Sequence, residues 1–156
     1  MDTNMLYYKI YEGDVKSRDY IKWAMNMLDN DCSSTNLNIL SGLEEPLNIF
    51  EVEDYFNRAS REIDLRVPSR EECNQYYKIH LLKTILEDKN NAIDLAYEVY
   101  KVVREEINTE VFSRWFELSE IIDDFLYSDN VENLTRTYLT SVIVQVAKNQ
   151  IKEGRM

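Results

Sequence analysis

Glycine and proline are scarce in this chain, whose 156 residues include three glycines and two prolines. Sheets joined by tight turns use both residues, because glycine adopts positive φ angles and proline restricts φ. Their scarcity therefore favours long helices joined by short connections. The sequence also has no glycine-rich phosphate-binding loop, which excludes P-loop and Rossmann nucleotide enzymes.

The sequence contains only two cysteines and one histidine, which limits its possible metal and nucleophile chemistry. Cys32 and Cys73 are far apart and do not make the framework of a disulfide-rich secreted domain. His80 alone cannot supply a zinc site or the paired ligands of a helical di-iron centre. We therefore predict no metal, no cofactor and no catalytic residue. An enzyme built from carboxylates, with His80 as a helper, is the least favoured of three functional hypotheses.

Long apolar runs and an N-terminal signal are also absent from the sequence. Residues 142–146 form the densest apolar segment and are too short to cross a bilayer. Residues 1–11 have neither a basic leader nor a small-residue cleavage site. We therefore expect a cytoplasmic protein that has no membrane partner.

Basic residues are missing from two long windows, which together hold more negative charge than the net charge of −11. Trp23–Asn57 contains seven acids without a Lys or Arg, and Trp115–Thr135 contains six. Binding to a phosphate backbone requires clustered Lys and Arg, so nucleic acid is not expected as a partner. Segregated negative charge instead produces a directed field, which attracts a basic protein.

Apolar residues recur at helical spacing along nearly the whole chain, with capping residues between the segments. This pattern predicts an all-α fold, a single-domain multi-helix bundle of about six or seven amphipathic helices over residues 1–156. The Ser-x-x-Glu capping box at Ser69–Glu72 is the clearest start signal. The helices are predicted to begin next to Ser17, Ser33 or Ser34, Asn48, Ser69, Asn91, Asn108 or Thr109, and Asp129 or Asn130.

Local features at the chain ends and in one turn lead to finer expectations. Residues 1–13 are left open between extended or irregular chain and a first helical turn, and residues 153–156 are assigned to a tail. Gly42 is expected in the left-handed conformation that often ends a helix. Residues 140–147 are rich in β-branched side chains, but i, i+4 spacing on both sides favours a helix over a strand. Its predicted buried stripe is Leu134, Tyr138, Val142, Val146 and Ile151.

The second acidic window holds the strongest candidate for a binding surface. Glu117, Glu120 and Asp124 follow i, i+3, i+7 spacing, which places them on one face of a helix. Like charges at this spacing destabilise an isolated helix, so the acidic face either serves a partner or is a merely tolerated solvated surface. Tyrosines beside such acids supply anchoring area. The predicted partner-binding residues are Glu117, Glu120, Asp123, Asp124, Asp129, Glu132, Tyr127, Glu44, Glu45 and Asp54.

The run Cys32–Leu43, followed by Asn48–Tyr55, resembles a segment of small uncharacterised all-helical bacterial proteins, some of them of immunity type. The resemblance covers a small part of the chain and contains no diagnostic motif. It implies a helical inhibitor of another protein, and it transfers no functional residue to this sequence.

We therefore expect a non-enzymatic acidic module that neutralises or regulates a basic protein, as an immunity or antitoxin-type inhibitor does. An acidic surface accelerates encounter with a basic partner, and aromatic anchors slow dissociation. The alternative is a structural or scaffolding helical module, a homo-oligomer included, in which acidity serves solubility. Partner binding that weakens sharply with salt would favour the first hypothesis, because salt screens the field.

Overall fold

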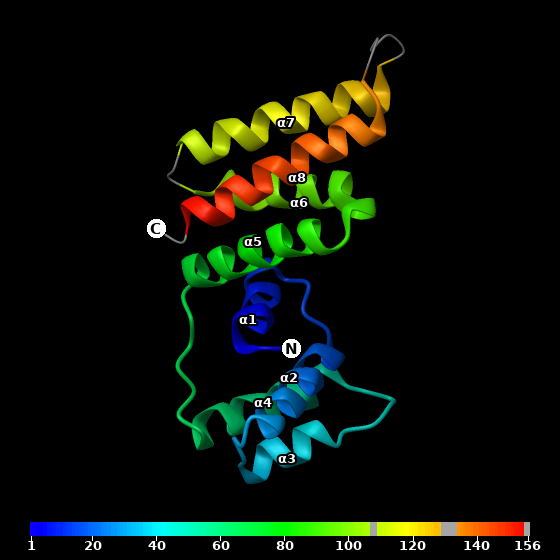
Figure 1. Ribbon diagram of the computed structural model, residues 1–156. Coiled ribbons are helices and arrows are strands. Elements are labelled where there is room, and N and C mark those ends of the chain that lie inside the picture. Colours follow the sequence, from blue (N-terminus) through cyan, green and yellow to red (C-terminus); the bar gives the residue numbers. More distant parts are fainter. Residues whose placement is uncertain (107–108, 129–133, 155–156) are drawn as a thin grey trace. The chain divides into compact units, whose positions relative to one another are not determined.

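A computed structural model describes residues 1–106, 109–128 and 134–154 of the chain (Figure 1). Within these residues all regular structure is helical, which confirms the predicted all-α class. The described part contains eight α-helices rather than six or seven, and one short 3₁₀ helix. The elements are α1 (Thr3–Glu12), α2 (Ser17–Asp29), α3 (Thr35–Ser41), α4 (Ile49–Glu62), α5 (Arg70–Glu87), η1 (Lys89–Asn91), α6 (Ala92–Val103), α7 (Thr109–Tyr127) and α8 (Arg136–Glu153).

The chain divides into two compact units, Met1–Tyr76 (unit 1) and Tyr77–Met156 (unit 2). Each unit has a buried apolar cluster of its own. The boundary falls within α5, which therefore contributes residues to both clusters. The single domain predicted over residues 1–156 stays a prediction.

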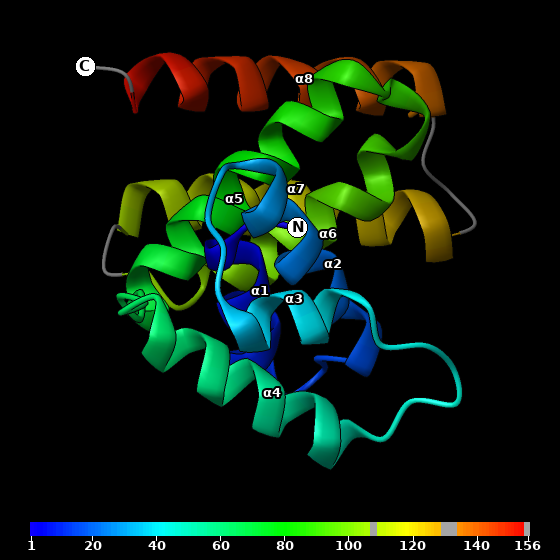
Figure 2. The same ribbon diagram turned by 90° about the horizontal axis from the view of Figure 1, so that it is seen from below.

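Unit 1 is built around the contacts of α2 with α3 and α4, and the three helices lie together in Figure 2. Phe56 of α4 is central to its core, because its ring lies 4.9 Å from that of Tyr20 and 5.0 Å from that of Trp23. Trp23 is fully buried, and its indole N–H donates to the Thr3 hydroxyl at 3.0 Å. This bond attaches α2 to the beginning of α1.

In unit 2, α6 packs against both α7 and α8, and α7 also contacts α8. Trp115 of α7 is fully buried, and its indole N–H donates to the Gln150 side chain of α8 at 2.5 Å. Gln150 is itself buried, so the bond satisfies both polar groups within the apolar core. It fixes α7 and α8 in register, and with them the outward faces of both helices.

Capping side chains bond helix N–H groups at three of the predicted helix starts, and the starts next to Ser17, Asn91 and Thr109 also agree with the structure. The Ser34 hydroxyl accepts the Leu37 N–H at 3.2 Å, and the Asn48 side chain accepts the Phe50 N–H at 2.9 Å. The Ser69–Glu72 box is complete, since the Ser69 N–H donates to the Glu72 carboxylate at 2.7 Å and the Glu72 N–H to the Ser69 hydroxyl at 3.1 Å. Each cap satisfies helix N–H groups that would otherwise have no partner.

The first residues of the chain and the first glycines differ from expectation. Residues 1–13 are not extended: α1 begins after Asp2, whose carboxylate accepts the Met5 N–H at 3.0 Å. The helix ends at Gly13 with φ of 74°, the left-handed conformation that glycine adopts without steric cost. Gly42 has φ of −99°, so the left-handed conformation predicted for it is wrong.

The last helix is confirmed over residues 140–147, but its start lies later than predicted. α8 begins after Thr135, whose hydroxyl accepts the Tyr138 N–H at 3.1 Å. The predicted start next to Asp129 or Asn130 is therefore wrong, and both residues lie outside the described part of the chain. The predicted tail from residue 153 is also too early, because Glu153 is the last residue of α8.

The buried stripe observed on α8 differs from the predicted one by a rotation of about one residue around the helix. The buried residues are Leu139, Ile143, Val144, Ala147 and Gln150, whereas Tyr138 is 59% exposed. Valine and isoleucine occur on adjacent sides of this helix, so two neighbouring stripes fit the apolar spacing almost equally well. Gln150 is a polar residue on the buried side, and its bond to Trp115 decides the orientation.

Candidate protein-binding surface

The buried side of α7 determines which residues the helix turns outward. Trp115, Leu118 and Ile122 are buried at i, i+3 and i+7, so the inward side of the helix is fixed along its length. The opposite side carries Glu117, Glu120 and Asp124, and all three are exposed. The structure thus brings these three predicted partner-binding residues together on one outward face.

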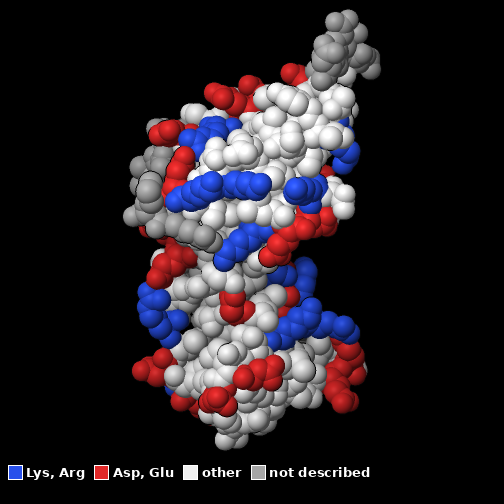
Figure 3. Space-filling view, viewed as in Figure 1, with Lys and Arg blue, Asp and Glu red and all other residues white. Residues whose placement is uncertain are grey.

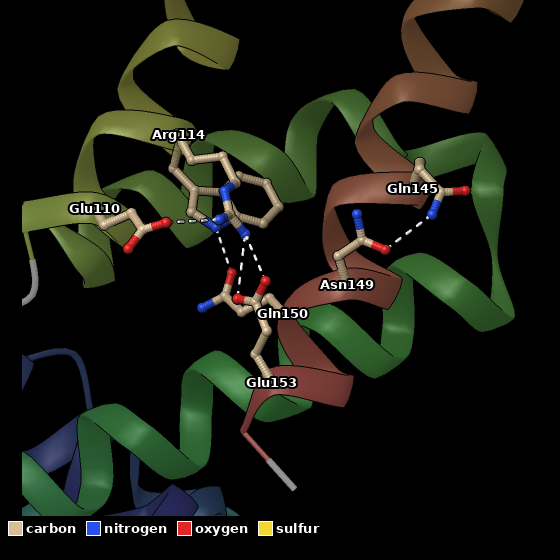
Figure 4. A network of polar contacts seen from close by, with 7 residues as sticks. Glu110, Arg114, Gln145, Asn149, Gln150 and Glu153 are labelled. Atoms are coloured by element: carbon tan, nitrogen blue, oxygen red, sulfur yellow. Dashed lines mark hydrogen bonds and ion pairs between the residues drawn. The ribbon is translucent and has the colours of Figure 1, made fainter. Parts of the chain in front are cut away.

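None of these three carboxylates forms an ion pair with a described residue. The nearest base in the sequence, Arg114, pairs instead with Glu153 of α8 at 3.3 Å and with Glu110, one turn earlier on α7, at 3.5 Å (Figure 4). Since residues 115–128 contain no Lys or Arg, α7 supplies no counter-charge of its own to this face. Its negative field is directed into solvent.

Apolar side chains are exposed along both edges of the same face. Phe116 (39% exposed) and Tyr127 (81%) lie on one edge, and Ile121 (40%) lies on the other. The Phe116 ring is supported by the Phe112 ring at 5.9 Å and the Tyr100 ring at 6.2 Å. Exposed apolar area supported from beneath and placed beside charge is typical of a binding surface. The α7 surface is defined here as Glu117, Glu120 and Asp124 with Phe116, Ile121 and Tyr127.

Asp123 lies at the edge of the α7 surface and is held by a neighbouring helix. The Tyr97 hydroxyl of α6 donates a hydrogen bond to the Asp123 carboxylate. Burial of the Tyr97 hydroxyl, together with this bond, raises the pKa of Tyr97 well above its ordinary value. Tyr97 therefore stays a neutral donor at physiological pH and fixes Asp123 against α6. The sequence does not reveal this contact, because it joins two residues on different helices.

The predicted acids of unit 1 are largely compensated by bases. The Arg18 guanidinium donates to the Glu45 carboxylate at 2.8 Å and lowers the pKa of Glu45, assisted by the Leu47 N–H. Asp54 pairs with Arg58 one turn later on α4 at 2.7 Å. Glu44 is exposed in the connection between α3 and α4. These residues offer a partner less unpaired charge than the α7 surface.

Two of the predicted partner-binding residues, Asp129 and Glu132, lie outside the described residues. They follow Tyr127 in the sequence, immediately after the end of α7. Their contribution to partner binding stays a prediction.

The residues considered for enzymatic chemistry do not converge in the described part of the chain. His80 is exposed, and its ring stacks 6.4 Å from that of Tyr77. Cys73 is buried, and burial raises the pKa of its thiol, which makes the thiolate scarce. No group of three His, Cys, Asp or Glu side chains is placed to hold a metal ion within residues 1–106, 109–128 and 134–154.

Two adjoining hollows open on unit 1, with volumes of about 330 and 370 Å³. They share Arg18, Glu45 and Leu47, so the exposed Arg18–Glu45 ion pair contributes to the lining of both hollows. Their linings combine aliphatic side chains with Lys, Arg and Glu, and neither lining contains a histidine or a cysteine.

No family model, curated protein or solved structure matches this chain. Within the described residues, none of the helices is both long and apolar enough to traverse a bilayer.

Proposed function

We propose that this chain is a non-enzymatic acidic module that binds a basic protein partner through the α7 surface and thereby neutralises or regulates it. The observation that supports this function is the set of unpaired carboxylates Glu117, Glu120 and Asp124 on one outward helix face. Exposed apolar side chains lie on both sides of that set. Charge and apolar area therefore occur together, as binding requires.

The two kinds of side chain have different roles in binding. Unpaired carboxylates accelerate encounter with a basic surface, because opposite fields steer diffusion. Apolar anchors such as Tyr127 and Phe116 slow dissociation once water has been excluded around them. A surface with carboxylates alone would associate rapidly and release its partner equally rapidly.

An immunity or antitoxin-type inhibitor is the most concrete form of this function. Enzymes that act on nucleic acid have basic active sites, because they bind phosphates. An acidic inhibitor can occupy such a site without any catalytic group of its own. We place this activity in the cytoplasm, with a protein rather than a nucleic acid or a membrane as the partner.

The test is capture of partners from a lysate of the source organism with three bait proteins at low and high salt. The baits are the wild type, an α7 variant (Glu117→Gln, Glu120→Gln, Asp124→Asn) and a control variant (Glu51→Gln, Glu71→Gln, Glu87→Gln). Both variants lose three negative charges, and the control residues are exposed acids on α4 and α5. The control therefore separates the effect of position from that of net charge.

We expect the wild type and the control to retain the same basic protein at low salt and to release it at high salt. The α7 variant should bind that protein with an association rate constant at least about tenfold lower, because the local steering field is lost. Equal retention by the α7 variant and the wild type would contradict the proposal, as would a partner that is acidic.

A further inference from the structure

The outward face of α8 has the opposite charge to that of α7. Lys148 and Lys152 are exposed and lie one turn apart, so they share one side of the helix. Ser141 and Gln145 continue this side toward the N-terminus, and both are exposed. Residues 136–152 contain no acid at all. The α8 surface is defined here as Tyr138, Ser141, Gln145, Lys148 and Lys152.

The lysines of the α8 surface form no ion pair with any described residue. Glu153, the only acid of α8, is engaged by Arg114 of α7 at the seam between the two helices (Figure 4). Figure 3 shows basic side chains gathered on the face of unit 2 that carries α8 in Figure 1. The positive charge of this surface is therefore directed outward, as the negative charge of α7 is.

The α7 and α8 surfaces are complementary in spacing as well as in sign. Lys148 and Lys152 are four residues apart on their helix, and so are Glu120 and Asp124. Each surface also exposes a tyrosine, Tyr138 on α8 and Tyr127 on α7. Both surfaces point away from the core of the same unit, so they cannot meet within one molecule. Two copies of the chain can bring them together.

We propose that the α8 surface of one copy binds the α7 surface of a second copy. The inference rests on the α7 surface that carries the proposed function, and it adds a way of regulating access to that surface. Self-association covers Glu117, Glu120 and Asp124 until a more basic partner displaces the second copy. Because one contact leaves the α7 surface of one copy and the α8 surface of the other unoccupied, the contact is heterologous, and assemblies grow head to tail or close into rings.

The contact must be weak, because two lysines face three carboxylates and every copy has a net charge of −11. A basic partner with more Lys and Arg gains more from the α7 surface and competes effectively. Weak self-association that yields to a strongly basic protein is what a regulated binding surface requires.

Charge-swapped variants provide the test, measured by sedimentation velocity over a series of protein concentrations. One variant carries Lys148→Glu and Lys152→Glu, and the other carries Glu120→Lys and Asp124→Lys. Each variant alone presents two surfaces of the same sign and should remain monomeric. An equimolar mixture restores opposite charges at both kinds of contact and should associate into assemblies in which the two variants alternate.

A matched control keeps the test specific to α8. The pair Lys22→Glu and Arg61→Glu changes two exposed bases of unit 1 and shifts the net charge by the same amount as the α8 variant. We expect this control to associate as the wild type does, and the α8 variant to have a dissociation constant at least about tenfold higher. A variant that had lost its fold would not recover association in the mixture.

A wild type that is monomeric at every concentration, or a mixture that does not associate, would overturn the inference. The proposed function is tested separately by partner capture with the α8 variant, whose α7 surface is intact. Retention of a basic partner by a monomeric wild type would leave the proposed function standing without self-association. A mixture that associates, combined with an α7 variant that still captures the partner, would leave self-association standing without the proposed function.

Discussion

Lys78 and Glu106 form an ion pair that is almost completely removed from water. The ammonium and carboxylate are 2.6 Å apart, and the side chains are only 10% and 11% exposed. Removing one member of such a pair leaves the other charge buried without compensation. We therefore predict that Lys78→Met lowers the free energy of unfolding of unit 2 by about 3–5 kcal/mol. Urea denaturation followed at Trp115, which is buried in unit 2, measures this change.

Lys101 and Glu98 provide the matched control for that substitution. Their ion pair has the same length of 2.6 Å, but the side chains are 58% and 41% exposed. Exposed pairs contribute about 0–1 kcal/mol, because water already solvates both charges. Lys101→Met should therefore have a small effect. Equal losses from Lys78→Met and Lys101→Met would show that burial does not determine the cost.

Tyr76 links α5 to the beginning of the chain through Asp2, and this link depends on pH. The Tyr76 hydroxyl donates to the Asp2 carboxylate, which raises the pKa of Tyr76 from 10.0 to about 12. Because the pKa is higher in the folded state, the stabilisation is complete below pH 10 and is lost as pH rises from about 10 to about 12. We predict that Tyr76→Phe reduces the loss of stability over this interval. Denaturation midpoints at a series of alkaline pH values measure it.

Tyr138→Phe is the control for the alkaline experiment, since Tyr138 is exposed on α8. It should leave the pH dependence unchanged. Tyr20 also has a raised pKa, caused by burial and by its bond to Glu53, so Tyr76→Phe should remove only part of the alkaline loss in unit 1. Identical pH profiles for Tyr76→Phe and the wild type would disprove the role assigned to the Asp2 bond.

The α7 helix combines stable packing with an unfavourable outward face. Glu117 and Glu120 are three residues apart, Glu120 and Asp124 are four apart, and Asp124 lies near the C-terminus, where the helix dipole disfavours negative charge. We predict that Glu117→Gln, Glu120→Gln and Asp124→Asn together raise the free energy of unfolding by about 0.5 kcal/mol. Urea denaturation of the α7 variant measures this gain in the free energy of unfolding. A loss of stability would mean that these carboxylates have structural partners.

The starts of the helices were predictable where capping side chains determine them, whereas the orientation of a helix in the core was less predictable. Ser34, Asn48 and Ser69 cap helices because their side chains reach N–H groups two or three residues away, which a sequence displays directly. The orientation of α8 depends on Gln150 bonding Trp115 on another helix. No local sequence pattern contains that information, so the predicted buried stripe wrongly included Tyr138, which is exposed.

The α7 surface was likewise predictable only in part: its helical spacing can be read from the sequence, but its contacts with other helices cannot. Helical spacing predicts that Glu117, Glu120 and Asp124 share a face, and burial of Trp115 turns that face outward. The attachment of Asp123 to Tyr97 and the direction of Arg114 depend on the packing of α7 against other helices. Those contacts determine which acids remain unpaired, and they cannot be read from the sequence.

Within the whole chain, each compact unit contains one tryptophan at the centre of its core. Trp23 is fully buried in unit 1 and Trp115 in unit 2. A protein labelled with 5-fluorotryptophan therefore reports the unfolding of each unit by its own ¹⁹F NMR signal, without any change to the core. This labelling distinguishes the predicted single cooperative domain from two units that unfold separately.

Separate apolar clusters favour separate unfolding, because most of the burial that stabilises each unit lies within that unit. We predict that Lys78→Met lowers the urea midpoint reported by Trp115 and leaves the midpoint reported by Trp23 unchanged. The continuous α5 helix could transmit the loss, since it supplies Cys73 to one cluster and Leu81 to the other. An equal shift of both signals would mean that α5 couples the clusters and that residues 1–156 unfold as one domain. In that case the α7 surface would draw its stability from both cores.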